Sequence, residues 1–140
     1  METKTFENIV AVRLDKGDEI LSSLLKVAKE EKIAFASVSG IGATDDFEVG
    51  VFDLEKQDYV RARYAGNHEI NSLAGNLTTK GGEPYVHLHM TAAGPGGKLA
   101  GGHLFRAVIS LTAEIFLEKI DGAADRAFDD TLKINRIKFD

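Results

Sequence analysis

Apolar residues recur along this chain with two periods, one typical of a helix and the other typical of strands. Within residues 18–31 they recur at helical spacing, and Asp18 and Glu19 stand where the positive end of a helix favours acidic side chains. We therefore predict one amphipathic helix over residues 18–31. Its predicted core-facing residues are Ile20, Leu21, Leu24, Leu25 and Ala28.

The remaining apolar stretches are short, often alternating, and bounded by turn residues, as is typical of strands. The predicted strands are 6–14, 33–39, 47–53, 59–65, 69–79, 85–92, 104–117 and 132–139. Gly40 and Gly42 are expected to end the second of them, and residues 121–130 are expected to form a polar excursion. The long apolar strand 104–117 is expected to be central. Because no strand–helix–strand rhythm is present, the pattern predicts an α+β fold with seven to nine strands and one clear helix.

Length and composition predict a single globular domain over residues 1–140. The sequence is 44% hydrophobic and 28% charged and has no cysteine, which excludes disulfides and thiolate metal sites. No apolar run approaches the ~20 residues that span a bilayer, and residues 1–6 lack the apolar core of a signal peptide. We therefore expect a cytoplasmic protein with no membrane partner.

The charge distribution argues against a role in binding duplex DNA. The formal charge is −5, and the 17 basic residues are scattered without two in a row. DNA-binding domains usually carry a basic patch or stripe. Binding of DNA by this chain alone is therefore disfavoured, although a patch formed by folding or assembly stays open.

Three of the four histidines fall in one predicted hairpin. His87 and His89, two residues apart on a strand, project from the same face. If residues 95–97 form the loop tip, His103 lies directly across from His89. Three neutral imidazoles leave a fourth position open on zinc, as in catalytic zinc sites. The spacing therefore predicts a site for zinc or another divalent transition metal.

Two alternatives stay open at this point. A slip of one residue in the hairpin would send His103 to the opposite face, and a bulge at Gly101-Gly102 would reset the register. The three histidines would otherwise form a half-buried polar face without a metal. His68, the fourth histidine, is expected at the surface.

Other candidate motifs are weaker. The glycine-rich stretch 94–102 fails the phosphate-loop pattern, because Leu99 stands where Ser or Thr must follow Gly-Lys. No G-x-S-x-G nucleophile motif is present. Glu69 begins an otherwise apolar strand and is a candidate acid–base carboxylate, with a surface position as the alternative.

Four segments together resemble one known family, the domain conserved in plants and prokaryotes (PPC). They are RLDKGDEIL at 13–21, GNHEINSLAGN at 66–76, EPYVHLH at 83–89 and GGHL at 101–104. Their order runs through nearly the whole chain. The resemblance implies a highly curved antiparallel sheet of about seven strands with one main helix packed on it, assembled as a homotrimer.

The resemblance also bears on function. The related fold of acetolactate decarboxylase holds zinc through three histidines, which supports the metal hypothesis. Many family members are named DNA-binding proteins, but in plants separate AT-hook segments contact the DNA, and no Arg-Gly-Arg core of that kind occurs here. Plant members generally lack the histidine set.

Two functions remain as hypotheses. In the first, a trimeric protein uses zinc at His87, His89 and His103 for lyase-like chemistry on a small molecule, with Glu69 as the catalytic proton shuttle. In the second, the chain is a non-enzymatic assembly or regulatory module with a protein or nucleic-acid partner.

Overall fold

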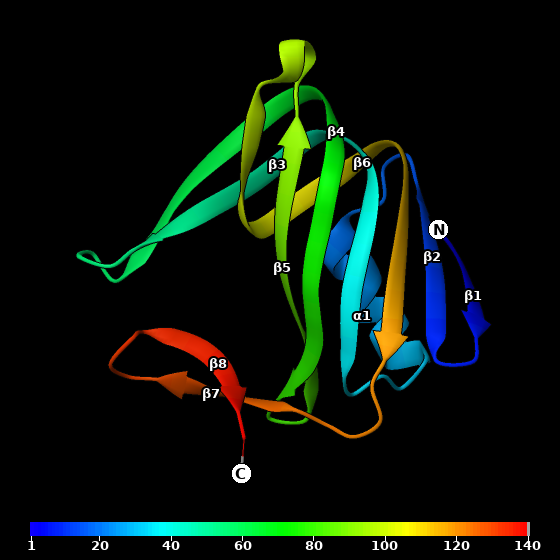
Figure 1. Ribbon diagram of the computed structural model, residues 1–140, viewed down its shortest axis with the longest axis vertical. Helices are drawn as coiled ribbons and strands as arrows, with labels where there is room; N and C mark the ends of the chain where they lie inside the picture. The colour runs from blue at the N-terminus through cyan, green and yellow to red at the C-terminus, as the bar shows by residue number, and fades with distance from the viewer. Residues whose placement is uncertain (140) are drawn as a thin grey trace.

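In the computed structural model, which describes residues 1–139, one helix lies on a curved sheet of eight strands (Figure 1). This arrangement confirms the predicted α+β class. The elements are β1 (Glu2–Phe6), β2 (Ile9–Asp15), α1 (Ile20–Glu30), β3 (Ala36–Asp53), β4 (Asp58–Lys80), β5 (Glu83–Ala93), the 3-10 turn η1 (Pro95–Gly97), β6 (Leu99–Lys119), β7 (Asp125–Asp129) and β8 (Ile134–Lys138).

Strand pairing is antiparallel except for one parallel contact, where Thr79 of β4 meets Asp125 of β7. The order is β1-β2-β6-β3-β4-β7-β8, and β5 pairs with both β4 and β6. The pairs β3–β4, β4–β5, β5–β6 and β6–β3 therefore close a circuit of hydrogen-bonded strands. The predicted central position of the long apolar strand is confirmed, because β6 has partners β2, β3 and β5.

The strands are longer than the sequence pattern predicts. Gly40 and Gly42 do not end a strand, since β3 continues through them to Asp53. At Gly42, β3 and β6 approach so closely that a Cβ on this glycine would stand 2.6 Å from the Cβ of Ala113. Glycine permits this contact, and the register shifts there as the sheet bends. The glycines therefore mark a bend in one continuous strand.

The helix is two residues shorter at its start than predicted. Glu19 is the N-cap, and its carboxylate accepts hydrogen bonds from the backbone N–H groups of Leu21 and Ser22 at 3.0 and 2.8 Å. Asp18 lies outside the helix because its carboxylate instead accepts from the N–H of Asp15 at 2.9 Å. The cap thus fixes the start of α1 at Ile20.

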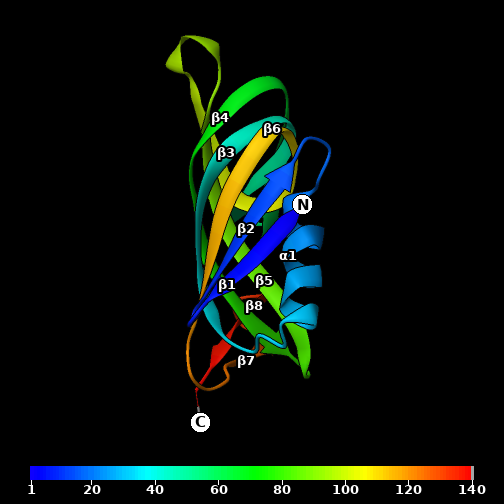
Figure 2. The same cartoon turned by 90° about the vertical axis from the view of Figure 1, so that its right-hand side faces the viewer.

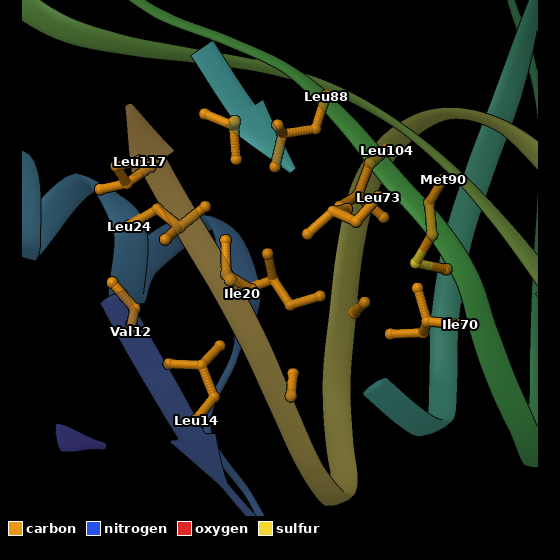
Figure 3. Packing of buried hydrophobic residues seen from close by; sticks show 14 of the residues in the cluster. Val12, Leu14, Ile20, Leu24, Ile70, Leu73, Leu88, Met90, Leu104 and Leu117 are labelled. Carbon is orange, nitrogen blue, oxygen red and sulfur yellow. The ribbon is translucent and has the colours of Figure 1, made fainter. Parts of the chain in front are cut away.

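One apolar cluster joins the helix to the sheet. Figure 2 shows α1 lying along one side of the curved sheet, and Figure 3 shows Ile20 and Leu24 among the strand side chains. Ile20, Leu24 and Ala28 are buried as predicted, and Val27 joins them, whereas Leu21 and Leu25 are only partly buried. The apolar face of the helix is therefore rotated slightly toward Val27.

The C-terminal part differs most from the prediction. Within residues 121–130, which were expected to be polar and outside the strands, Asp125–Asp129 form β7, which pairs with β8 in a hairpin. This hairpin lies apart from the helix, at the end of β4 (Figure 1). Among the described residues, no helix is both long and apolar enough to cross a membrane.

Candidate metal centre

His87, His89 and His103 form one cluster on the hairpin of β5 and β6. His103 pairs directly with His89, which is the register predicted from the turn at residues 95–97. The ring centroids lie 5.3 Å apart for His87–His89, 4.9 Å for His87–His103 and 5.6 Å for His89–His103. One ring nitrogen from each histidine lies within 4.8 Å of the others. Neither a register slip nor a reset by a bulge occurs between β5 and β6.

The histidines differ in exposure, and burial lowers the pKa of two of them. His89 is exposed, whereas His87 and His103 are partly buried. Loss of water contact lowers the pKa of His87 to about 4, with further lowering by Arg126 and His89. The pKa of His103 is also lowered to about 4, first by burial and then by His87 and His89. Both rings are therefore neutral at pH 7, as metal ligands must be.

Arg126 on β7 reaches the cluster from the C-terminal hairpin. Its Nη2 lies 3.3 Å from Nδ1 of His87, and because a guanidinium only donates, Nδ1 is the acceptor. The same group donates to Oδ1 of Asn76 at 2.7 Å, and Nε donates to Oγ1 of Thr78 at 2.8 Å. A metal bound through Nδ1 of His87 would replace the Arg126 contact.

The residues present fit a transition metal. Nδ1 of His103 is buried and has no hydrogen-bond partner. Leaving such a nitrogen unpaired costs free energy, and a coordinated ion would supply the missing interaction. Three imidazoles suit zinc, copper, nickel or iron, whereas magnesium and calcium prefer oxygen ligands.

A cavity of about 260 Å³ adjoins the cluster, and both His87 and His103 line it. Its walls come from β4, β5, β6 and the β7–β8 hairpin. Aromatic rings, two cationic side chains and an amide form most of the remaining wall: Tyr59, Tyr85, Phe105, Arg61, Lys133 and Asn135. Two of the three histidines therefore face this cavity.

Two other residues singled out in the sequence lie elsewhere. Glu69 is exposed on β4 and lines a separate hollow with Ile41, Asn71 and Leu111. Its role in proton transfer stays a prediction. His68 is partly buried rather than fully at the surface, with its ring 5.0 Å from that of Phe47, and it is not part of the cluster.

The sequence pattern did not reveal the contribution of the C-terminal hairpin. Arg126 and Asn135 stand in segments that carry no ligand spacing or motif. Arg126 is 39 residues from His87 along the chain, and only the pairing of β7 with the end of β4 brings them together. A lone arginine in a polar stretch offers no signal of such a contact.

Comparison with known proteins confirms the resemblance to the domain conserved in plants and prokaryotes, abbreviated PPC above and PCC in the family model. The model of the Plants and Prokaryotes Conserved (PCC) domain matches residues 1–121. Among solved structures, one from Bacteroides thetaiotaomicron, named a "putative DNA binding protein", is 26% identical with a TM-score of 0.95. The match covers 99% of this chain and 96% of that chain. A protein from Archaeoglobus fulgidus described as metal-containing is 30% identical with a TM-score of 0.87, over 99% of this chain and 97% of that one.

A more distant likeness concerns the fold alone. Acetolactate decarboxylase from Bacillus subtilis is 18% identical with a TM-score of 0.56, over 79% of this chain and 52% of that enzyme. No curated protein matches the sequence.

Proposed function

The chain belongs to the Plants and Prokaryotes Conserved (PCC) domain family, and we propose that it has a metal centre formed by His87, His89 and His103. The observation that carries the proposal is the direct pairing of His89 with His103, with His87 two residues away on the same face. The low pKa of His87 and His103 supports it, because both imidazole rings are neutral at pH 7, the form that coordinates a metal.

Zinc is the proposed ion. Three histidine ligands are a common zinc set, and they leave one coordination position open. The A. fulgidus relative described as metal-containing supports a metal in this family. That name does not give the identity of the ion, so the choice of zinc rests on the imidazole ligands.

We further propose that the centre acts on a small molecule. A zinc ion held in this way supplies a Lewis acid, which polarises a carbonyl group or activates water. The cavity beside His87 and His103 provides room for such a molecule, and aromatic rings form part of its wall. Lyase-like chemistry fits this arrangement, with Glu69 as a proton shuttle only if its carboxylate reaches the site in the assembled protein.

The second candidate function is a non-enzymatic assembly or regulatory module. The name of the B. thetaiotaomicron neighbour, a "putative DNA binding protein", favours it. The net charge of −5 opposes direct binding of duplex DNA by this chain alone. In this alternative the metal would stabilise the hairpin and take no part in chemistry.

A homotrimer is part of the proposal. Exposed apolar side chains on β3 and β6 support assembly, because Ile41 and Leu111 are 58% and 72% exposed and line the same hollow. The number of three subunits comes from the family resemblance.

Elemental analysis of untagged protein tests the metal centre. About one zinc per chain is expected in the wild type, and loss of the metal is expected in His89→Ala. His68→Ala is the matched control, because His68 is the one histidine outside the cluster. Equal metal content in wild type and His89→Ala, or no uptake of supplied zinc, would overturn the proposal.

A further inference from the structure

We propose that the cavity beside the histidine cluster binds a small organic carboxylate that also carries a hydroxyl or amine hydrogen-bond donor. The inference rests on the proposed metal centre and names the ligand class of that site. It follows from the charges around the cavity, the chemistry of its walls and one unpaired oxygen.

Positive charge surrounds the cavity without an acidic residue in its wall. Arg61 and Lys133 line it, and Arg126 lies directly behind His87. Arg61 has an ion-pair partner outside the cavity, Glu48, at 3.4 Å. Within residues 1–139, Lys133 forms no ion pair, and the contacts of Arg126 are all to neutral groups.

A bound divalent metal would add two further positive charges that no neutral imidazole offsets. Placing a dication near a buried guanidinium is unfavourable unless an anion is bound between or beside them. The positive charges of the metal and of Arg126 therefore predict an anionic ligand. Coordination through Nδ1 of His87 would also remove the hydrogen bond that Arg126 now donates to it, which leaves the guanidinium charge less well compensated.

The walls and the volume select a small organic anion. Tyr59, Tyr85 and Phe105 provide flat apolar surface, and the guanidinium of Arg61 lies 3.7 Å from the ring centre of Phe105. Binding sites for drug-sized molecules are typically about 300–1,000 Å³. A cavity of about 260 Å³ therefore suits a carboxylate of a few carbon atoms.

Asn135 on β8 accounts for the hydrogen-bond donor. Its Oδ1 is buried and has no partner, although the residue lines the cavity. An unpaired buried acceptor destabilises the folded chain, and a donor on the ligand would supply the missing hydrogen bond. A hydroxyl or amine on the carboxylate would supply that donor.

The experiment is an NMR titration of the zinc-loaded full chain with three probes of similar size. Lactate carries both the carboxylate and the hydroxyl, lactamide replaces the carboxylate by a neutral amide, and propionate lacks the hydroxyl. Lactate is expected to bind about tenfold more tightly than lactamide, the size expected for hydrogen bonds to a charged group, and a few-fold more tightly than propionate, because the hydroxyl would bond to a neutral amide oxygen. The amide signals that shift should belong to β5 and the β7–β8 hairpin.

Two variants locate the binding. Lys133→Gln should weaken lactate binding a few-fold, as expected for a partly solvated charge. Lys32→Gln is the matched control, because both lysines are exposed and have positive φ, 52° at Lys32 and 57° at Lys133. Asn135→Ala should remove the difference between lactate and propionate, and its backbone carbonyl still accepts from Arg126.

Zinc content is measured first, so that the two proposals fail separately. A chain that takes up no zinc overturns the metal centre and this assignment with it. A zinc-loaded chain that binds lactate and lactamide equally, or whose lactate affinity is the same in Lys133→Gln, overturns the carboxylate site and leaves the metal centre standing.

Discussion

His103 on β6 lies directly opposite His89 on β5, and their ring centroids are 5.6 Å apart. This pairing depends on the tight turn at η1 and on the backbone of the residue before His103. Gly102 has φ +153°, and a Cβ there would stand 2.6 Å from the carbonyl oxygen of Gly50 on β3. The position of His103 is therefore fixed by β5, with which it pairs, and by β3, against which Gly102 packs.

Gly102→Ala is expected to weaken zinc binding by at least about tenfold, because the added methyl group would push β6 away from β3 and displace His103. Competition with a chromophoric chelator measures the affinity. Gly17→Ala is the control, since Gly17 also has positive φ, no atom would lie within 4 Å of its Cβ, and it lies outside the β5–β6 hairpin. Wild-type affinity in Gly102→Ala would contradict this role.

The imidazole signals of His87 and His103 in metal-free protein are expected to titrate near pH 4. Their folded-state pKa is lowered from 6.5, so between about pH 6.5 and 4 the unfolded chain binds protons that the folded chain does not. Their contribution to stability is therefore complete above pH 6.5 and declines as the pH falls toward 4. NMR titration, with signals assigned through single histidine variants, checks this. Midpoints near 6.5 for both residues would refute it.

Leu24→Ala is expected to lower the free energy of unfolding by about 2–5 kcal/mol, because Leu24 is fully buried between α1 and the sheet. Leu25→Ala should cost clearly less, since that side chain is only partly buried. Urea denaturation measures both. A larger loss in Leu25→Ala would mean that the apolar face of α1 is assigned incorrectly.

Light scattering is expected to give the mass of a trimer at micromolar concentration. Leu111→Glu should reduce this mass, because it places a charge on the exposed apolar hollow of β3 and β6. Leu54→Glu is the control, as Leu54 is 80% exposed in the turn between β3 and β4, away from that hollow. A monomer mass for the wild type would exclude the trimer.

Binding of duplex DNA by the isolated chain is expected to be weaker than about 10⁻⁶ M at ~150 mM salt. Few phosphates can be neutralised by a chain of net charge −5 with scattered basic residues. Fluorescence anisotropy with a short labelled duplex measures the affinity. Sub-micromolar binding under these conditions would favour the regulatory alternative.

The sequence by itself determined the helix and the strand character of most of the chain, and it predicted one register for the hairpin of the three histidines while a one-residue slip stayed open. Each of these depends on local periodicity: 3.6 for the apolar face of α1, and two for the face shared by His87 and His89. A turn at residues 95–97 predicted His103 opposite His89, and the structure has this pairing, whereas the sequence alone did not exclude a slip or a bulge.

The tertiary structure alone decided what surrounds the cluster. The bend at Gly42 and the pairing of β6 with β3 depend on contacts between strands far apart in the chain, for which local patterns carry no information. The same holds for Arg126, which is buried behind His87 because β7 meets the end of β4 at Thr79. The lowered pKa of His87 and the cationic cavity are consequences of that packing, since burial and nearby charge are properties of the folded chain.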